Sequence, residues 1–237
     1  MRDQIFNNQS DISDFCFDES VVAVFDDMVK RSVPGYEAMI QMIGLLTRTY
    51  GQDDSNYYDL GASTGATTLA LALNNQCKNV RFIAIDNSTD MVSQCQKNLV
   101  GKVNNLEVVC SDIKDICIEN ASVVVLNLTL QFIDIEKRAD LITKIYHGLN
   151  NGGALIISEK IHVDDKSEQA RLTDLHMDFK RANGYSELEI ANKRQSLENI
   201  LVTENSETHL KRLQQCGFRE STHYFQCLNF ASFLSVK

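Results

Sequence analysis

Residues 59–65 read Asp-Leu-Gly-Ala-Ser-Thr-Gly, between a hydrophobic run and a helical stretch that begins near Ala66. A strand that ends here must turn into a helix within a few small residues. Gly61 and Gly65 carry no Cβ, so backbone N–H groups of the turn can approach a ligand closely. The next expected strand ends at Asp86, whose carboxylate is placed to accept both hydroxyl groups of a ribose. This pairing predicts a nucleoside cradle on a parallel α/β sheet.

The first residue of the segment, Asp59, narrows the class of nucleoside. A carboxylate just before the turn suits a cationic ligand better than a pyrophosphate, because like charges repel. S-adenosylmethionine carries both an ammonium and a sulfonium group. We therefore expect S-adenosylmethionine in the cradle rather than a dinucleotide.

Length and composition set further limits. The chain has 237 residues, of which 43% are hydrophobic, and no break in composition, so we expect residues 1–237 to form a single α/β domain. The net charge of −9 argues against direct tight binding to nucleic acid, which needs a concentrated basic face. No apolar run is long enough to cross a membrane and the N-terminus lacks a signal-peptide core, so we expect a cytoplasmic protein.

Cysteines and histidines show no metal-ligand spacing, and we expect no metal. The seven cysteines are an odd number without a Cys-x-x-Cys pair. We expect them to be reduced and mainly to fill buried space. They are Cys16, Cys77, Cys95, Cys110, Cys117, Cys216 and Cys227.

Hydrophobic periodicity and turn residues predict strands that alternate with helices. The expected strands end at residue 60 and span 80–85, 106–110, 121–126 and 154–158, and the expected helices span 66–73, 88–99 and 135–149. Such alternation is typical of a doubly wound, mostly parallel sheet. Its ligand is expected at the carboxyl ends of the strands.

Three other segments lie outside this alternation. Helices at 19–30 and 36–49 are expected within residues 1–50, which can fold over the carboxyl edge of the sheet as a lid. Residues 161–205 are too long and polar for a simple crossover, and we interpret them as an inserted helical arm that covers the site or docks on another subunit. Two β-like runs at 218–225 and 227–236 predict an antiparallel hairpin at the sheet edge.

Cradle, acidic second strand and terminal hairpin together resemble the Rossmann-like class I S-adenosylmethionine-dependent methyltransferases, with a seven-strand, mostly parallel sheet. Within that class, the chain from about residue 17 onward resembles the carboxy-S-adenosyl-L-methionine synthase family. The motifs that carry this resemblance are Arg-Ser-Val-Pro-Gly-Tyr at 31–36, Leu-Asn-Asn-Gly-Gly-Ala-Leu at 149–155 and His-Met-Asp-Phe-Lys-Arg-Ala-Asn-Gly-Tyr-Ser at 176–186, with shorter pieces at 17–19, 86–88, 118–122, 130–132, 158–160 and 207–209.

The resemblance implies an activity that composition and spacing could not have shown. Prephenate loses a carboxyl group as phenylpyruvate forms, and S-adenosyl-L-methionine is carboxylated at its methyl carbon, through a sulfonium ylide that captures carbon dioxide. The product, carboxy-S-adenosyl-L-methionine, supplies the carboxymethyl group for the wobble uridine (cmo5U) of tRNA, and the family implies a homodimer. Ala62 and Thr64 depart from the Cys and Leu that the family often has there.

Five candidate ligand-binding residues lie at the first two strand ends. Backbone groups of Gly61, Ala62 and Ser63 are expected to contact the amino-acid end of the nucleoside, the alternative being a plain strand-to-helix turn. Asp86 is expected to hold the ribose diol. Asn87 either bonds the same sugar or caps the next helix.

Five more candidates come from other segments. Asp112 and Ile113 are expected at the adenine, with a solvated loop aspartate as the alternative, and Asn127 is expected beside the sulfonium. The Tyr36 hydroxyl is expected on a carboxylate, unless it is an aromatic of the core or lid. By resemblance alone, Arg194 clamps the carboxylate of the product, in its own subunit or across the dimer. Without the resemblance, Arg194 is an ordinary surface residue of a helix.

Other functions stay open at this stage. An ordinary S-adenosylmethionine-dependent methyltransferase for a small molecule shares the fold and the cofactor. Residues 61–65 also satisfy Gly-x-Ser-x-Gly, the nucleophile turn of α/β-hydrolases, with Asp112 and either His209 or His223 as partners. A protein that binds the nucleoside without chemistry is a third alternative.

Overall fold

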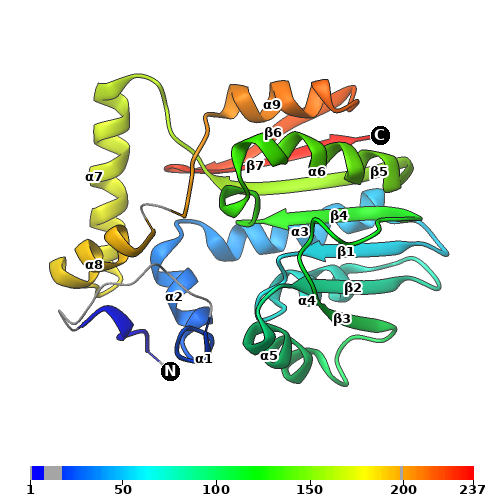
Figure 1. The fold of residues 1–237 in the computed structure, drawn as a ribbon, viewed down its shortest axis with the longest axis horizontal. Coiled ribbons are helices and arrows are strands. Elements are labelled where there is room, and N and C mark those ends of the chain that lie inside the picture. Colours follow the sequence, from blue (N-terminus) through cyan, green and yellow to red (C-terminus); the bar gives the residue numbers. More distant parts are fainter. Residues whose placement is uncertain (1, 8–17, 198–199) are drawn as a thin grey trace.

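A computed structural model describes residues 2–7, 18–197 and 200–237. Its centre is one seven-stranded sheet in the order β3-β2-β1-β4-β5-β7-β6 (Figure 1). All pairs from β3 to β5 are parallel, while β7 runs antiparallel to both β5 and β6. The strands are β1 Asn56–Leu60, β2 Arg81–Asp86, β3 Leu106–Cys110, β4 Ala121–Asn127, β5 Leu149–Lys160, β6 Glu220–Cys227 and β7 Phe230–Val236.

Helices cover both faces of this sheet because its central strands are apolar on both sides. In β4, Val123 and Val125 pack against α3 (Tyr36–Tyr50), α4 (Ala66–Asn74) and α5 (Thr89–Leu99). The alternate residues Val124 and Leu126 point to the other face, toward α6 (Ile135–Gly148) and α9 (Ser206–Gln215). The predicted α/β fold class, a seven-stranded and mostly parallel sheet with an antiparallel C-terminal hairpin, is confirmed.

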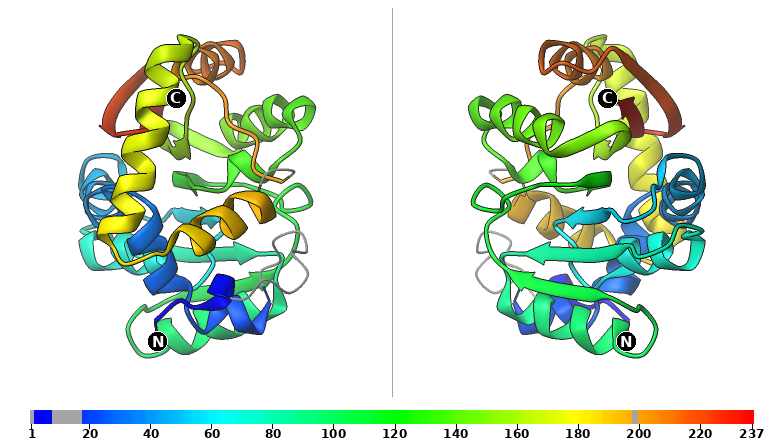
Figure 2. Two further views of the ribbon diagram at one scale, coloured as in Figure 1. Left: turned by 90° about the vertical axis from the view of Figure 1, so that its left-hand side faces the viewer. Right: turned by 90° about the vertical axis from the view of Figure 1, so that its right-hand side faces the viewer.

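A third group of elements lies across the carboxyl ends of the parallel strands, on the side that faces the viewer in the left view of Figure 2. The group contains η1 (Ile5–Asn7), α1 (Glu19–Val22), α2 (Phe25–Ser32), α7 (Lys166–Ala182) and α8 (Glu187–Leu197). Within it α7 contacts α2, and α8 contacts both α7 and η1. Two segments far apart in the sequence, the expected lid and the expected arm, therefore meet over the strand ends. The short η2 (Leu130–Phe132) follows β4.

Several expected boundaries differ from those observed. The strand expected at 154–158 is part of the longer β5, and the hairpin strands expected at 218–225 and 227–236 are β6 and β7. The helix expected at 19–30 is divided into α1 and α2, because Val24 has φ −122° and its amide bonds the carbonyl of Val21 rather than that of a residue one full turn earlier. β-branched valines are weak helix formers, and three of them gather here. The helix expected at 135–149 ends at Gly148, where a Cβ would collide with the carbonyl of Ile118, and Leu149 already pairs in the sheet.

The cysteines also correct an expectation. Cys95 and Cys216 are buried, but Cys110, at the end of the edge strand β3, and Cys117, in the loop that follows, are exposed. All six described cysteines are free thiols, and Cys16, like Phe17 of the sequence motifs, lies outside the described residues. Among the described residues, no helix combines the length and apolarity that a membrane span requires.

Candidate nucleoside and substrate cavity

A cavity of about 450 Å³ opens at the carboxyl ends of β1, β2 and β4, beneath the covering helices. It lies at the edge of the sheet where parallel α/β folds bind their ligands. Nine of the ten predicted site residues line it: Tyr36, Gly61, Ala62, Ser63, Asp86, Asn87, Asp112, Ile113 and Asn127. Arg194 does not.

The cradle is a tight turn whose amides are already paired inside the protein. The amides of Gly61 and Ala62 both donate to the carbonyl of Ile85, each at 2.8 Å, and that of Ser63 donates to Asp86 at 2.9 Å. Gly61 has φ +84°, and a Cβ there would collide with the side chain of Thr129. The turn therefore needs glycine, but its N–H groups serve strand β2, so a ligand would meet carbonyl oxygens and small side chains instead.

Asp86 joins the cradle to the next helix. Its Oδ2 accepts from Ser63 and its Oδ1 accepts the amide of Ser88 at 3.0 Å, while burial raises the pKa of the carboxyl despite these bonds. The amide of Asn87 also contributes a hydrogen bond to this carboxyl group. A carboxylate has about four acceptor positions, so about one remains for a ribose hydroxyl. Ser88, not Asn87, caps α5, which leaves Asn87 exposed at the rim of the cavity.

Asp59 lies behind the turn rather than in the cavity. It is 1% exposed, and Thr68 donates a hydrogen bond to its Oδ2 at 2.6 Å. Its Oδ1 has no hydrogen-bond partner in the described structure, and burial raises the pKa of this carboxyl to about 7. The expectation of a carboxylate facing a cationic ligand is therefore corrected: any effect of Asp59 on a ligand acts through its field, not through contact.

Asn127 presents an unsatisfied acceptor at the end of β4. Its amide nitrogen donates to Thr67 at 3.3 Å, whereas its buried Oδ1 has no hydrogen-bond partner among the described residues. A buried amide oxygen without a partner costs about 1–3 kcal/mol. The next residue, Leu128, has φ +60°, a strained conformation that clusters at functional sites. Both observations fit a ligand atom with positive character beside Asn127.

The adenine candidates sit after β3. Ile113 is buried, and Asp112 pairs with the ammonium of Lys114 at 3.1 Å. Burial opposes ionisation of Asp112, yet the bonds from Lys114 bring its pKa below the usual value. Across the cavity, burial raises the pKa of Tyr36, so its hydroxyl stays protonated and able to donate.

Three cations meet in the same cavity. For the basic pairs at 180–181, 193–194 and 211–212 the sequence favours solvated helix faces, with one or two pairs as candidates to meet a small anionic ligand. Lys160 ends β5, Lys180 lies on α7 and Lys193 lies on α8, and all three line the cavity. Burial is the main cause that lowers the pKa of each, to about 8 for Lys180 and about 7 for Lys193. Asp86 ends β2 and Lys160 ends β5, with β1 and β4 between these two strands, so the cavity has separate acidic and basic parts. No sequence signal reveals this group, because its members come from three elements.

Beside these lysines, His176 is buried and neutral. Its Nε2 lies 2.8 Å from the carbonyl of Ser32, so that this nitrogen carries the proton. Burial lowers the pKa of the imidazole to about 3, with Lys180 as the next cause. His176 is therefore not a carrier of positive charge at neutral pH.

Arg194 is exposed on α8, next to the buried Lys193. Its charge is close enough to lower the pKa of both Lys160 and Lys180, after the larger effect of burial. A clamp role for Arg194 stays a prediction.

The hydrolase alternative finds no support in the geometry. His209 and His223 both pack on the ring of Phe233, with centroid distances of 5.1 and 5.0 Å, and neither lines the cavity that Ser63 lines. A nucleophile needs its base within hydrogen-bond reach. Among the described residues, no group of histidine, cysteine, aspartate and glutamate has the arrangement of a metal site.

Among solved structures, an O-methyltransferase family protein from Burkholderia thailandensis superposes with a TM-score of 0.66 at 17% identity, covering 93% of this chain and 60% of that one. Human N-acetylserotonin methyltransferase gives a TM-score of 0.65 at 13% identity, with 92% and 55% covered. The chain thus spans about three fifths of the length of these structures, and at such identities the likeness concerns the fold alone.

Sequence comparisons are more specific. A family described as "Methyltransferase domain" matches residues 58–153. The carboxy-S-adenosyl-L-methionine synthase of Ruthia magnifica subsp. Calyptogena magnifica is 60% identical over 237 residues, which is 100% of both chains. The synthase of Shewanella sp. (strain ANA-3) is 50% identical over 239 residues, covering 100% of this chain and 98% of the relative. The resemblance inferred from the sequence motifs is thereby confirmed, and the chain belongs to the carboxy-S-adenosyl-L-methionine synthase family.

Proposed function

We propose that this protein converts S-adenosyl-L-methionine and prephenate to carboxy-S-adenosyl-L-methionine and phenylpyruvate. Family membership supports the product, and the cavity supports the substrates. The observation that carries the proposal is the division of one cavity into an acidic part at Asp86 and a basic part at Lys160, Lys180 and Lys193. A cationic nucleoside and a dianionic acid are the pair of substrates that such a division suits.

In this proposal the nucleoside occupies the strand ends. Asp86 holds the ribose, Asp112 and Ile113 hold the adenine, and Asn127 lies beside the sulfonium. The protonated hydroxyl of Tyr36 donates to a carboxylate. A sulfonium beside an amide oxygen keeps its methyl group fixed, which is positioning rather than acid–base chemistry.

The reaction balances without a protein base. Prephenate divides into phenylpyruvate, carbon dioxide and hydroxide; the hydroxide removes a proton from the sulfonium methyl group, and the resulting carbanion bonds the carbon dioxide, releasing one water. Carbon dioxide must not escape between these steps. Covering helices α2, α7 and α8, which contribute residues to the wall of the cavity, suit that requirement.

The wider role follows the family. We propose that the product serves as carboxymethyl donor for the cmo5U modification of tRNA. The enzyme that makes this product is a cytoplasmic homodimer, and each subunit is a single domain. A net charge of −9 fits an enzyme that supplies this donor without gripping tRNA itself.

Incubation of the purified protein with S-adenosyl-L-methionine and prephenate, followed by mass spectrometry, tests the proposal. The expected nucleoside is heavier than S-adenosyl-L-methionine by one carbon dioxide, and it forms together with phenylpyruvate. Formation of S-adenosylhomocysteine with an acceptor would instead identify a conventional methyltransferase, the alternative that the fold also permits. Binding without any turnover would leave only a nucleoside-binding protein.

A further inference from the structure

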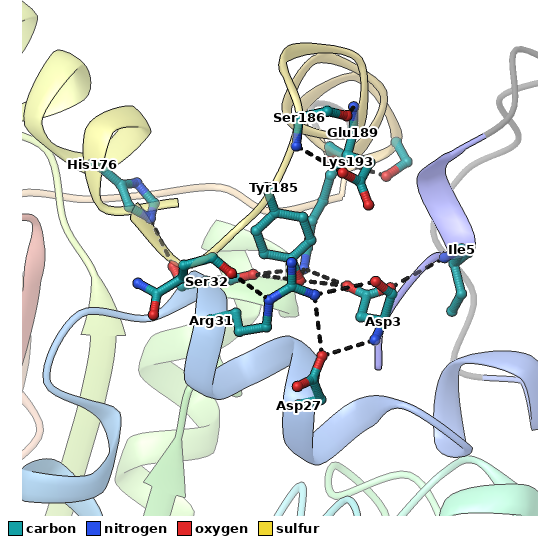
Figure 3. Close-up of polar contacts among 12 residues, drawn as sticks. Asp3, Ile5, Asp27, Arg31, Ser32, His176, Tyr185, Ser186, Glu189 and Lys193 are labelled. Atoms are coloured by element: carbon teal, nitrogen blue, oxygen red, sulfur yellow. Dashed lines mark hydrogen bonds and ion pairs between the residues drawn. The ribbon is translucent and has the colours of Figure 1, made fainter. Parts of the chain in front are cut away.

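The basic part of the cavity is built from elements that the fold brings together over the strand ends. One of its members, Lys193, is 5% exposed and donates to the hydroxyl of Ser32 at 2.8 Å (Figure 3). Its ammonium also lies 3.8 Å from the Oδ2 of Asp3, which in turn accepts from the hydroxyl of Tyr185. The N-terminal segment therefore neutralises Lys193 and fixes its position.

Lys160 and Lys180 have no such neutralising partner. Both are half-buried and line the cavity, and neither ammonium makes a hydrogen bond or ion pair with any described residue. After burial, the charge of Lys160 lowers the pKa of Lys180, and the charge of Arg194 lowers the pKa of both lysines. Half-buried cations that repel each other are costly unless an anion joins them.

Neighbouring residues hold these two ammonium groups at the cavity wall. The amide of Lys160 donates to Gln131 at 3.0 Å, within the loop that lines the cavity after β4. On α7, one turn before Lys180, His176 anchors the helix to α2 through the carbonyl of Ser32. Both lysines thus project from anchored backbone, as a preformed subsite requires.

We propose that Lys160 and Lys180 form a carboxylate subsite for the second substrate, with Lys193, paired with Asp3, behind them. This inference rests on the proposed function. Of the two carboxylates of prephenate, the subsite holds the one on the pyruvyl side chain, which phenylpyruvate retains. Cations on the departing carboxylate would stabilise the ground state, from which negative charge leaves as carbon dioxide forms, and would raise the barrier.

The test is binding of phenylpyruvate, measured by calorimetry on the full chain saturated with S-adenosylhomocysteine. Lys160→Gln and Lys180→Gln should each lower the affinity for phenylpyruvate by at least about tenfold, the usual scale for a charge-assisted contact. Lys180→Arg should recover part of the loss. Phenylacetone, which lacks the carboxylate, should bind wild type and both glutamine variants equally.

Two controls separate binding from folding. Lys211→Gln, in an exposed ion pair on α9, should bind phenylpyruvate as wild type does. S-adenosylhomocysteine should bind all variants equally. The melting temperature of Lys180→Gln should equal or exceed that of wild type, because an unpaired cation is removed; a lower value would assign the ammonium a structural partner and overturn the proposal.

The remaining outcomes distinguish the inference from the proposed function. In one outcome, the wild type carboxylates the nucleoside with prephenate, but the lysine variants keep their affinity for phenylpyruvate. This would overturn the proposed subsite and leave the proposed function intact. A subsite that binds phenylpyruvate through its lysines, in a protein that does not turn over prephenate, would overturn the function alone. An equal loss of S-adenosylhomocysteine affinity would reassign the lysines to the amino-acid carboxylate of the nucleoside and overturn the proposal.

Discussion

Asp86 serves the fold through its carboxylate, and in the proposed function the same carboxylate also binds the ligand. Its two oxygens accept the amides of Ser63 and Ser88, which fixes the cradle relative to the start of α5. The same contacts orient the remaining acceptor position toward the cavity that the residue lines. A substitution at Asp86 therefore changes two things, and a useful experiment must separate them.

Replacing Asp86 with alanine should lower the affinity for S-adenosylhomocysteine by about 10- to 150-fold. This is equivalent to about 1.5–3 kcal/mol for a charge-assisted hydrogen bond to the ribose. Asp86→Asn should lose less, since one acceptor oxygen remains. Calorimetry gives both affinities, and circular dichroism checks the fold. Asp90→Asn, in the first turn of α5, is the matched control. Unchanged affinity in Asp86→Ala would remove the ribose assignment.

Among elements, the short η2 depends on a buried glutamate. Glu159 of β5 is 1% exposed and accepts the amides of Leu130 and Gln131 at 2.8 and 3.0 Å. These amides belong to the first turn of η2, where no helical partner exists for them. Burial raises the pKa of Glu159 to about 8 despite these bonds, so its carboxyl group acts here as an acceptor rather than as a charge. It holds in place a loop that supplies part of the cavity wall, including Gln131 and Phe132.

Glu159→Gln should lower the free energy of unfolding by about 1–3 kcal/mol, because an NH₂ group then faces a backbone N–H and leaves it unsatisfied. Urea denaturation measures the loss, and the affinity for S-adenosylhomocysteine should fall with it. Glu136→Gln, in the first turn of α6, provides the comparison. If the two variants were equally stable, the carboxylate would not be what holds η2.

In the molecule as a whole, a buried ionic network ties the chain beyond α8 to the helices of the sheet. Glu204 accepts from Arg138 of α6 and from Arg212 of α9, and all three side chains are almost fully buried. Burial alone would raise the pKa of Glu204, but the bonds from the two arginines overcome it and lower the pKa. A carboxyl group with a lowered pKa stabilises the folded state above its ordinary pKa, and that contribution is lost as the pH falls through the folded value.

Glu204→Gln should destabilise the protein by about 3–5 kcal/mol at pH 7, because two buried guanidinium groups lose their counter-charge. The difference from wild type should shrink below about pH 4.5, where protonated Glu204 resembles glutamine. The free energies of unfolding of both proteins, measured with urea at pH 7 and below about pH 4.5, test this expectation. Glu207→Gln, in an exposed pair with Lys211, should cost at most about 1 kcal/mol. A pH-independent difference would contradict the electrostatic account.

Arg194 is exposed on the single chain, so its proposed role can depend on the second subunit of the proposed homodimer. If Arg194 clamps the carboxylate of the product, Arg194→Ala should weaken the binding of carboxy-S-adenosyl-L-methionine by about 2–4 kcal/mol. The binding of S-adenosyl-L-methionine should weaken far less. Arg194→Lys should recover only part, because a point charge cannot reproduce the planar fork. Calorimetry with both nucleosides, beside sedimentation of the protein, measures this. Equal losses for both ligands would return Arg194 to the surface.

The sequence determined the scaffold and the nucleoside cradle. Alternating apolar strands, a glycine turn before α4 and an acidic end to β2 are local patterns, and the backbone expresses them wherever the chain folds. Nine site residues chosen from such patterns and from the family resemblance line one cavity, because parallel strands bring their carboxyl ends to one edge.

Only the tertiary structure decided the charges around that cavity. Lys160, Lys180 and Lys193 come from three separate elements, and in the sequence each looks like an ordinary solvated residue. Likewise Asp59, which heads the cradle motif, lies behind it, and Arg194 is exposed and outside the cavity lining, while its neighbour Lys193 is buried. Burial and the mutual field of charges are properties of the packed chain, so a linear pattern carries no record of them.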